Sequence, residues 1–315
     1  MNSQILISQD VLSPSYLPEK LLYREKEKAE LVKNLKNLVN TFIFGPYGSG
    51  KTTLAKLAIR ELDKKLSIAY VDCSVYQTTY SVLKEIIPKS ELILYRSNYE
   101  LIKELARFAK GEFIVCFDNF EKLKEKDLIA RLMSLNLCVI LISDEEENLS
   151  LLNESVRSNI PSRIRLRSYS VEQIFEILKS RAEKALARWS YSDALIKKIA
   201  EKSKGNLALG VNALKAAALR AENEGRKIKE RDIEMGNTFR LKLSYDEKIL
   251  LNILKECKSL PASRLYGFYV QNAKHAKGER SFRNYMENLC KKGFVRAVGE
   301  KRGRIYEVVE GDLNS

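Results

Sequence analysis

The stretch that decides the fold is Gly45-Pro46-Tyr47-Gly48-Ser49-Gly50-Lys51-Thr52, which matches the pattern G-x-x-x-x-G-K-[ST] without a mismatch. A short apolar, β-type run at residues 41–44 precedes it, and a helix-compatible stretch at residues 53–62 follows. A strand, a glycine-rich loop and a helix in this order are the context in which the pattern forms a phosphate-binding loop. The alternative, a glycine-rich turn that carries a lysine by chance, is disfavoured by this matching context.

The residue types in this loop are those that phosphate binding requires. Glycines let backbone N–H groups approach phosphate oxygens closely, and the following helix presents the positive end of its dipole there. Lys51 can reach the β- and γ-phosphates, and the Thr52 hydroxyl can ligate Mg²⁺. The motif therefore predicts that the chain binds a nucleoside triphosphate. The residues expected to hold it are Gly45, Pro46, Tyr47, Gly48, Ser49, Gly50, Lys51, Thr52 and Thr53.

Composition indicates a folded, strongly basic protein. The 315 residues leave room for about two or three domains, and 45% hydrophobic with 30% charged residues is typical of a globular chain. The formal net charge of +14 favours a polyanionic partner, although a surface selected for solubility or heat tolerance would look similar. We find no secretory signal, no apolar run near the ~18 residues that span a bilayer, and no C-x-x-C pair among the five cysteines. These features predict a cytoplasmic protein that does not bind membranes.

After the loop, short apolar runs alternate with polar or helical stretches, which predicts a parallel sheet covered by helices on both faces. With the strand before the loop, the runs make five strands; the other four lie at residues 67–71, 113–117, 138–142 and 163–167. The last run alternates polar and apolar residues, as an edge strand does.

Acidic residues end two of these runs. Asp118 directly follows the third run, where parallel-sheet nucleotide-binding proteins place a carboxylate associated with Mg²⁺. An aspartate that merely ends a strand is common, but the phosphate loop upstream favours the metal-associated role. Ser143 and Asp144 end the next run, and they would lie beside the γ-phosphate if that strand lies between the other two.

The remainder of the chain predicts two smaller domains. Ser170 and Gln173 form a capping box that begins the first of at least three helices, which gives an all-α domain. Ser244 and Glu247 form a second capping box, after which three helices and a β-hairpin follow. This layout is that of a winged helix-turn-helix. The expected domains are an α/β nucleotide-binding domain at 1–167, a helical domain at 168–240 and a winged-helix domain at 241–315.

Positive charge gathers in the last domain. Residues 280–304 contain eight lysines and arginines against two glutamates, a difference of +6. The apolar face of the third helix must pack inward, so its polar face is free for the major groove, and the turn of the hairpin suits phosphates or a minor groove. A winged domain that contacts proteins is the alternative. The expected DNA contacts are Arg280, Ser281, Arg283, Asn284, Lys301, Arg302 and Arg304.

Taken together, these motifs resemble an archaeal replication initiator of the origin-recognition-complex and cell-division-control type, an AAA+ ATPase with a C-terminal winged helix. The similarity extends over nearly the whole chain. The matching segments are Leu12 to Arg24, Val71 to Tyr80, Ser168 to Arg181 and Gly299 to Arg304. The resemblance implies that Tyr16, Pro18, Arg24 and Tyr169 line the adenine pocket, and that Tyr76 contacts DNA. It also implies ATP or ADP with Mg²⁺ as cofactors, double-stranded DNA as a partner, and other initiator subunits or a replicative helicase as further partners.

Several positions depart from the family's pattern. The family follows its Mg²⁺-associated aspartate with a glutamate that polarises the attacking water, whereas Asn119 follows Asp118 here. An amide cannot accept a proton, so hydrolysis should be slow unless Glu121 or another acid substitutes. Asp144 stands where the sensor-1 asparagine is expected, Ala208 where the sensor-2 arginine is expected, and Arg157 is the cation nearest the expected arginine finger. The expected catalytic set is Lys51, Asp118, Asn119 and Asp144, and whether the chain is an active ATPase stays open.

Three functions fit the sequence. The first is a nucleotide-binding initiator that recognises origin DNA and is associated with the nucleoid. The second is a winged-helix transcription regulator in which the nucleotide is structural, which the altered catalytic positions favour. The third is a signal-transducing ATPase whose targets are proteins, and salt-dependent binding to duplex DNA would argue against it.

Overall fold

The structure is a computed structural model that describes residues 4–13, 16–62, 66–87, 97–109, 113–235, 244–273, 276–291, 294–299 and 304–308. The chain divides into two compact units, residues 1–235 and residues 236–315, and each is described by itself. None of the helices within the described residues combines the length and the apolar character needed to cross a membrane.

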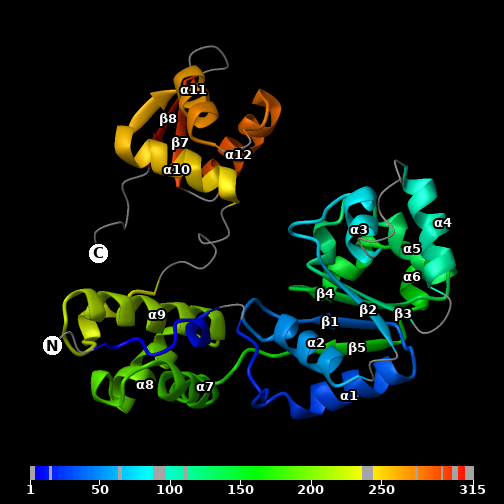
Figure 1. Cartoon of the computed structure of the whole chain (residues 1–315), viewed down its shortest axis with the longest axis horizontal. Coiled ribbons are helices and arrows are strands. Elements are labelled where there is room, and N and C mark those ends of the chain that lie inside the picture. Colours follow the sequence, from blue (N-terminus) through cyan, green and yellow to red (C-terminus); the bar gives the residue numbers. More distant parts are fainter. Residues whose placement is uncertain are drawn as a thin grey trace. The chain divides into compact units, whose positions relative to one another are not determined.

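The first unit is built on the five-stranded parallel sheet that the sequence predicts (Figure 1). Its strands are β1 (Thr41–Phe44), β2 (Ser67–Asp72), β3 (Phe113–Asp118), β4 (Cys138–Ser143) and β5 (Ser162–Arg165). They lie in the order β2-β3-β4-β1-β5, and every pairing is parallel. Strand β5 is at the edge, as its alternating pattern indicates. Strand β4 lies between β1 and β3, so the phosphate loop and the acidic strand ends meet at one edge of the sheet.

Helices cover both faces of this sheet, which explains why the central strands are apolar at every position. Alternate strand residues, such as Phe42 and Phe117, pack on one side with the helical residues Leu83, Leu101 and Leu132. The intervening residues of the same strands pack on the other face of the sheet. The helices on the first side are α3 (Thr79–Ile86), α4 (Asn98–Phe108), α5 (Asp127–Ser134) and α6 (Glu154–Ser158), and those on the second are α1 (Glu25–Lys36) and α2 (Lys51–Arg60).

A helical part follows the sheet within the same unit. It consists of α7 (Val171–Ala185), α8 (Asp193–Lys202) and α9 (Leu207–Asn223). The predicted capping box begins α7, since the Ser170 hydroxyl accepts from the Gln173 N–H and the Gln173 side chain accepts from the Ser170 N–H. The N-terminal segment packs here rather than on the sheet, because Ile5 and Leu12 are buried in the same apolar cluster as the three helices. The boundary at residue 167 stays a prediction.

The second unit has the winged-helix layout. Its elements are α10 (Tyr245–Cys257), β6 (Ser259–Pro261), α11 (Ala262–Asn272), α12 (Glu279–Lys291), β7 (Val295–Val298) and β8 (Ile305–Val308). The strands form an antiparallel sheet in the order β6-β8-β7, and Leu254, Tyr269 and Phe282 lie in the core. The Ser244–Glu247 capping box begins α10 as predicted. Strand β6 was not expected, because its three residues contain a proline and form a strand only by pairing with β8.

The first helix begins at Glu25, after Tyr23, whose φ of 64° does not fit a helix. One detail differs from the sequence-based expectation. Asp118 is the last residue of β3 and not the residue after it. The first unit also contains short 3₁₀ helices: η1 (Asp10–Leu12), η3 (Phe120–Lys122), η4 (Glu146–Leu151), η5 (Arg188–Ser190) and η6 (Glu230–Asp232).

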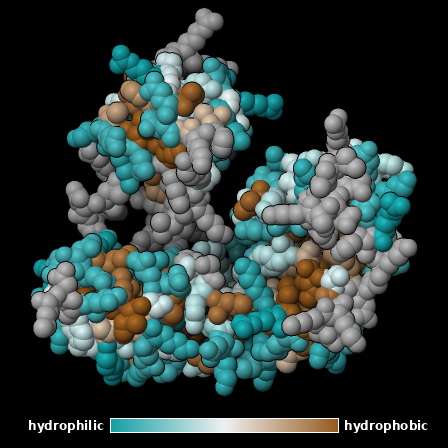
Figure 2. Space-filling model, in the orientation of Figure 1, coloured by the Kyte–Doolittle hydropathy of each residue, from teal (hydrophilic) through white to brown (hydrophobic). Residues whose placement is uncertain are grey.

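The surface is mainly polar (Figure 2). The face shown in this view is largely hydrophilic, with apolar residues visible in small areas between polar ones. Among the described residues the largest exposed apolar side chains are scattered along the chain, for example Ile7, Val75, Tyr99 and Trp189. Single exposed apolar residues of this kind are ordinary and need no functional explanation.

Candidate functional site

The loop between β1 and α2 has the backbone conformation that its glycines predict. Gly45, Gly48 and Gly50 all have positive φ, and Gly50 in the left-handed region caps α2. A side chain would also lack room here: a Cβ on Gly48 would come within 2.0 Å of the Asn206 Oδ1, at the start of α9. The loop is therefore enclosed between the sheet and the helical part. Gly50 and Thr53, at the start of α2, border the cavity between these two parts.

Lys51 has three partners within the chain. Its Nζ donates to the backbone oxygens of Gly45 at 2.6 Å and of Pro46 at 3.1 Å. Its third partner is Asp144, whose Oδ1 lies 2.8 Å from Nζ. Lys51 is buried, whereas the Asp144 side chain is 43% exposed at the end of β4. An ammonium group donates at most three hydrogen bonds, so a phosphate that accepts from Lys51 would replace one of the two backbone oxygens or Asp144.

Asp118 is the last residue of β3, and its carboxylate contacts side chains of α2 and β2. Its Oδ2 accepts from the Thr52 hydroxyl at 2.7 Å and from the Tyr70 hydroxyl at 2.5 Å. Burial and the nearby Asp118 charge raise the pKa of Tyr70 well above its ordinary value, so the phenol stays a donor. The two residues expected to hold a metal, Thr52 and Asp118, are therefore in direct contact.

Asn119 carries an amide at the position where the resemblance predicts a water-activating carboxylate. It adopts a left-handed conformation with φ 56°, and its Nδ2 donates to Asp72 Oδ1 at 3.2 Å, at the end of β2. The next acid along the chain, Glu121, contacts the end of β4. Its Oε2 accepts from the Ser143 hydroxyl at 3.0 Å, directly beside Asp144. The turn at Asn119 thus carries Glu121 to the end of β4.

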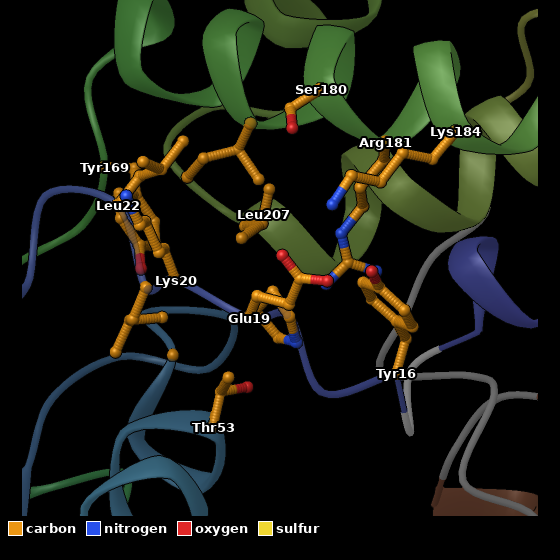
Figure 3. A pocket seen from close by; sticks show the side chains of 14 residues that line it. Tyr16, Glu19, Lys20, Leu22, Thr53, Tyr169, Ser180, Arg181, Lys184 and Leu207 are labelled. Carbon is orange, nitrogen blue, oxygen red and sulfur yellow. The ribbon is translucent and has the colours of Figure 1, made fainter.

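A cavity of about 220 Å³ lies next to this loop (Figure 3). Five of the residues predicted to bind the nucleotide line it: Tyr16, Pro18, Gly50, Thr53 and Tyr169. The remaining lining residues come from the N-terminal segment, α7 and α9; Leu22 belongs to the N-terminal signature matched in the sequence, and the others were not named as nucleotide contacts. These remaining residues are Glu19, Lys20, Leu21, Leu22, Ile177, Ser180, Arg181, Lys184 and Leu207.

Arg181 is the most informative of the missed residues. Its guanidinium lies 5.1 Å from the centre of the Tyr16 ring and donates to the backbone oxygen of Val11 at 3.0 Å. Burial lowers the pKa of Arg181, which nevertheless remains a cation at neutral pH. It lies about 130 residues after the loop in sequence, and only the packing of α7 against the N-terminal segment brings it to the cavity.

Arg24 was predicted to bind the nucleotide, but it is not among the residues that line the cavity. It is buried, its Nε donates to the Ser49 backbone oxygen at 3.4 Å, and its Nη2 donates to the Arg167 backbone oxygen. Its guanidinium also packs over the Tyr169 ring at 4.3 Å. Arg24 therefore connects the loop to the start of the helical part, and a direct contact with a nucleotide stays a prediction.

These residues fit a nucleotide. The cavity combines apolar walls with the cations of Lys20, Arg181 and Lys184, which suits a base attached to a charged chain. The Ser49 hydroxyl is buried with no hydrogen-bond partner among the described residues, as expected of a loop that closes on a phosphate group. No cluster of three or more metal-ligating side chains occurs in the described part of the chain, so a Mg²⁺ ion would need phosphate oxygens besides Thr52 and Asp118.

The other expected charge-stabilising positions lack cations near the loop. Ala208 is close to it, since its backbone nitrogen is 3.3 Å from where a Gly48 Cβ would lie, but its methyl group carries no charge. Arg157 is in the short helix α6. Among the described residues, Lys51 within the loop and Arg24, which donates to the Ser49 backbone oxygen, are cations in contact with the loop, whereas Arg181 and Lys184 line the cavity.

The DNA-contact candidates are mostly exposed. Arg280, Arg283 and Asn284 are exposed on α12, where Arg283 pairs with Glu279 at 3.1 Å, and Ser281 is half-buried. Arg304 is exposed just before β8, whereas Lys301 and Arg302 lie outside the described residues. In the first unit, Tyr76 is half-buried after β2, and a hydrogen bond with Glu85 raises the pKa of its hydroxyl.

Comparison with known proteins agrees with this architecture. A family model described as an AAA domain matches residues 39–153. The "ORC1-type DNA replication protein 9" of Halobacterium salinarum is 23% identical, over 97% of this chain and 94% of the relative. The "ORC1-type DNA replication protein 1" of Sulfurisphaera tokodaii is 25% identical, over 99% of this chain and 90% of the relative.

Solved structures show the same fold. The Aeropyrum pernix ORC1 protein in complex with DNA has a TM-score of 0.70 at 23% identity, covering 98% of this chain and 94% of that one. The Aeropyrum pernix ORC2 protein, in its ADPNP–ADP complexes, has a TM-score of 0.67 at 20% identity, with 97% and 94% covered. The similarity thus spans the sheet, the helical part and the winged-helix unit.

Proposed function

We propose that this chain, which resembles archaeal ORC1-type replication proteins over nearly its whole length, binds ATP or ADP and recognises duplex DNA at replication origins. The observation that carries the proposal is the pairing of a complete phosphate loop with a winged-helix unit whose third helix exposes arginines. Each feature alone is widespread. Their combination in one chain is what origin-binding initiators share.

Nucleotide binding is supported by the loop and its cavity. Backbone N–H groups at the start of α2 would take the phosphates, Lys51 would neutralise them, and Tyr16, Leu207 and Arg181 would surround the base and ribose. A Mg²⁺ ion would be held by Thr52, with Asp118 beside it, and would offset phosphate charge when bound. The ORC2 relative bound to ADPNP and ADP supports the same assignment.

DNA recognition is supported by the exposed polar face of α12. Arg280, Arg283 and Asn284 are types of side chain that reach base edges and phosphates from a major-groove helix. The ORC1 relative solved with DNA supports this role. Tyr76 and the basic residues between β7 and β8, which are Lys301, Arg302 and Arg304, are proposed as further contacts. Other initiator subunits or a replicative helicase are the proposed protein partners.

We further propose that hydrolysis is slow. Asn119 cannot accept a proton, and its amide is bonded to Asp72. The bound nucleotide would then act mainly as a structural element that fixes the loop against the helical part. The protein would be found in the cytoplasm, associated with the nucleoid.

The test is the binding of duplex DNA by the full chain, measured by fluorescence anisotropy over a range of salt concentrations. The double variant Arg280→Ala/Arg283→Ala should bind at least about tenfold more weakly and, if both arginines contact phosphates, should lower the salt-dependence slope by about 2, roughly one unit for each lost phosphate contact. Lys255→Ala is the matched control, because it removes one exposed cation from α10 of the same unit. Equal losses in the control, or no salt-dependent binding by the wild type, would contradict DNA recognition through α12 and would favour protein targets.

A transcription regulator is the second candidate, because the altered catalytic positions are compatible with a nucleotide that is only structural. Mapping the DNA sites occupied by the protein across its genome separates the two functions. Occupancy of one or a few origin-like sites supports an initiator, whereas occupancy of many promoters supports a regulator.

A further inference from the structure

We infer that Asp144 makes this site select a nucleoside diphosphate over a triphosphate, by holding Lys51 and by placing a negative charge where the terminal phosphate of a triphosphate would lie. The inference rests on the proposed nucleotide binding and assigns a specificity-determining residue within that site. The observation behind it is the ion pair between the loop lysine and a carboxylate at the end of β4.

The geometry places Asp144 close to the phosphate path. Strand β4 is hydrogen-bonded to β1, which leads into the loop, so the end of β4 faces the phosphate side of Lys51. Asp144 Oδ1 lies 2.8 Å from Lys51 Nζ, which is direct ion-pair contact. Two acceptors on one ammonium nitrogen lie about 4 to 5 Å apart, given ordinary hydrogen-bond lengths. A terminal phosphate that accepts from Lys51 would therefore lie at that distance from the carboxylate.

At such a distance two negative groups repel each other strongly enough to change affinity. A like charge within about 4 to 6 Å disfavours the charged form of a neighbour. A terminal phosphate carries close to two negative charges at neutral pH, and Asp144 adds a third. Glu121, held by Ser143 next to Asp144, contributes further negative charge on the same side. No cation other than Lys51 is paired with Asp144 among the contacts of the described residues.

A diphosphate avoids part of this cost. Its phosphates can lie within the ring of backbone N–H groups at the start of α2, which takes the α- and β-phosphates in loops of this kind. Lys51 can also reach its β-phosphate, but a diphosphate has no third phosphate that adds negative charge beside Asp144. An asparagine in place of Asp144 would present an amide N–H, which donates to a phosphate oxygen instead of repelling it. At position 144 a carboxylate therefore repels the terminal phosphate, whereas an amide attracts it.

The experiment measures the dissociation constants of a fluorescent ADP analogue and of a non-hydrolysable fluorescent ATP analogue. The full chain is first stripped of nucleotide, and titrations are done with and without Mg²⁺. We expect the wild type to bind the diphosphate about tenfold or more tightly than the triphosphate, and Asp144→Asn to reduce that ratio about tenfold. The effect should be larger without Mg²⁺, because the metal offsets part of the phosphate charge.

Glu145→Gln is the matched control. It removes the same charge from the adjacent exposed residue, and the wild-type ratio should persist. Asp144→Ser is a second variant that also removes the charge, and thermal melting confirms that each variant is folded. Because the Asp144 side chain is 43% exposed, these substitutions should not prevent folding.

The results separate the two proposals. If the wild type binds neither nucleotide, nucleotide binding itself fails, and the inference fails with it. If the wild type binds both nucleotides and the ratio is the same in Asp144→Asn, only the selectivity inference is overturned. It is also overturned if Asp144→Asn binds the triphosphate more weakly in Mg²⁺, since Asp144 would then act as a metal ligand.

Discussion

The two sides of the candidate nucleotide site differ in how far they keep the chemistry of an ATPase. The side formed by the loop and α2 has every feature that phosphate binding needs: positive φ at Gly48 and Gly50, an accessible helix N-terminus and a buried lysine. The side formed by the ends of β3 and β4 has an amide at Asn119 and a carboxylate at Asp144, where the resemblance predicts the reverse.

This difference shows that binding and hydrolysis place unequal demands on a sequence. Phosphate binding depends largely on backbone N–H groups and on one charge, so a short motif suffices. Hydrolysis depends on a base positioned for one water molecule, and a single substitution can remove it. A chain can therefore keep a complete binding loop while losing turnover. The predictions below test each side in turn.

The largest effect is expected from Lys51→Ala, on the binding side. Nucleotide affinity should fall at least about a hundredfold, because charge-assisted hydrogen bonds to the phosphates are lost and Asp144 is left without its partner. Isothermal titration calorimetry measures the affinity. Arg60→Ala, which removes an exposed cation from the last turn of the same helix, is the control and should bind like the wild type. Unchanged affinity in Lys51→Ala would show that nucleotide is not held by this loop.

The second effect is expected at Asn119, on the side of the site formed by the ends of β3 and β4. Asn119→Glu should raise the single-turnover rate of ATP hydrolysis about tenfold or more, since a general base contributes roughly a hundredfold or more when well placed. Asn119→Asp carries a carboxylate on a shorter side chain and should raise the rate less. A rate that does not change in Asn119→Glu, although ATP is bound, would mean that the missing base is not what limits hydrolysis.

A smaller effect is expected at Glu121, whose carboxylate accepts from the Ser143 hydroxyl at the end of β4. If Glu121 partly replaces the missing base, Glu121→Gln should lower the residual hydrolysis rate several-fold, about fivefold on the scale of a poorly placed base. Glu147→Gln, an exposed glutamate in η4, is the control. Equal rates in the wild type and in Glu121→Gln would assign the residual activity to another group.

Much of the fold follows from local sequence patterns. Continuous apolar runs predict buried parallel strands, and the capping boxes at Ser170 and Ser244 place the beginnings of α7 and α10 correctly. The loop motif predicts the turn geometry, because glycine alone adopts these conformations without strain. These signals are readable because each one depends on residues that are close together in the chain.

Features that depend on distant residues were not predictable in this way. Strand β6 exists because Leu260 pairs with Tyr306, and Arg181 reaches the cavity only because α7 packs against the N-terminal segment. Arg24 lies just before α1 and donates to the backbone oxygens of Ser49 and Arg167, which are distant in the chain, rather than lining the cavity. The Lys51–Asp144 ion pair joins residues 93 positions apart, and the sequence placed Asp144 near the phosphates only on the condition that β4 lies between β1 and β3, which the strand order meets.

The central claim, that this chain binds ATP and hydrolyses it slowly, is tested most directly by a single-turnover experiment with radiolabelled ATP and excess protein. The account predicts that the wild type keeps its ATP intact in the complex long after the Asn119→Glu variant has converted its own to ADP. Conversion at the same rate by both proteins, or no retention of ATP by the wild type, would contradict it.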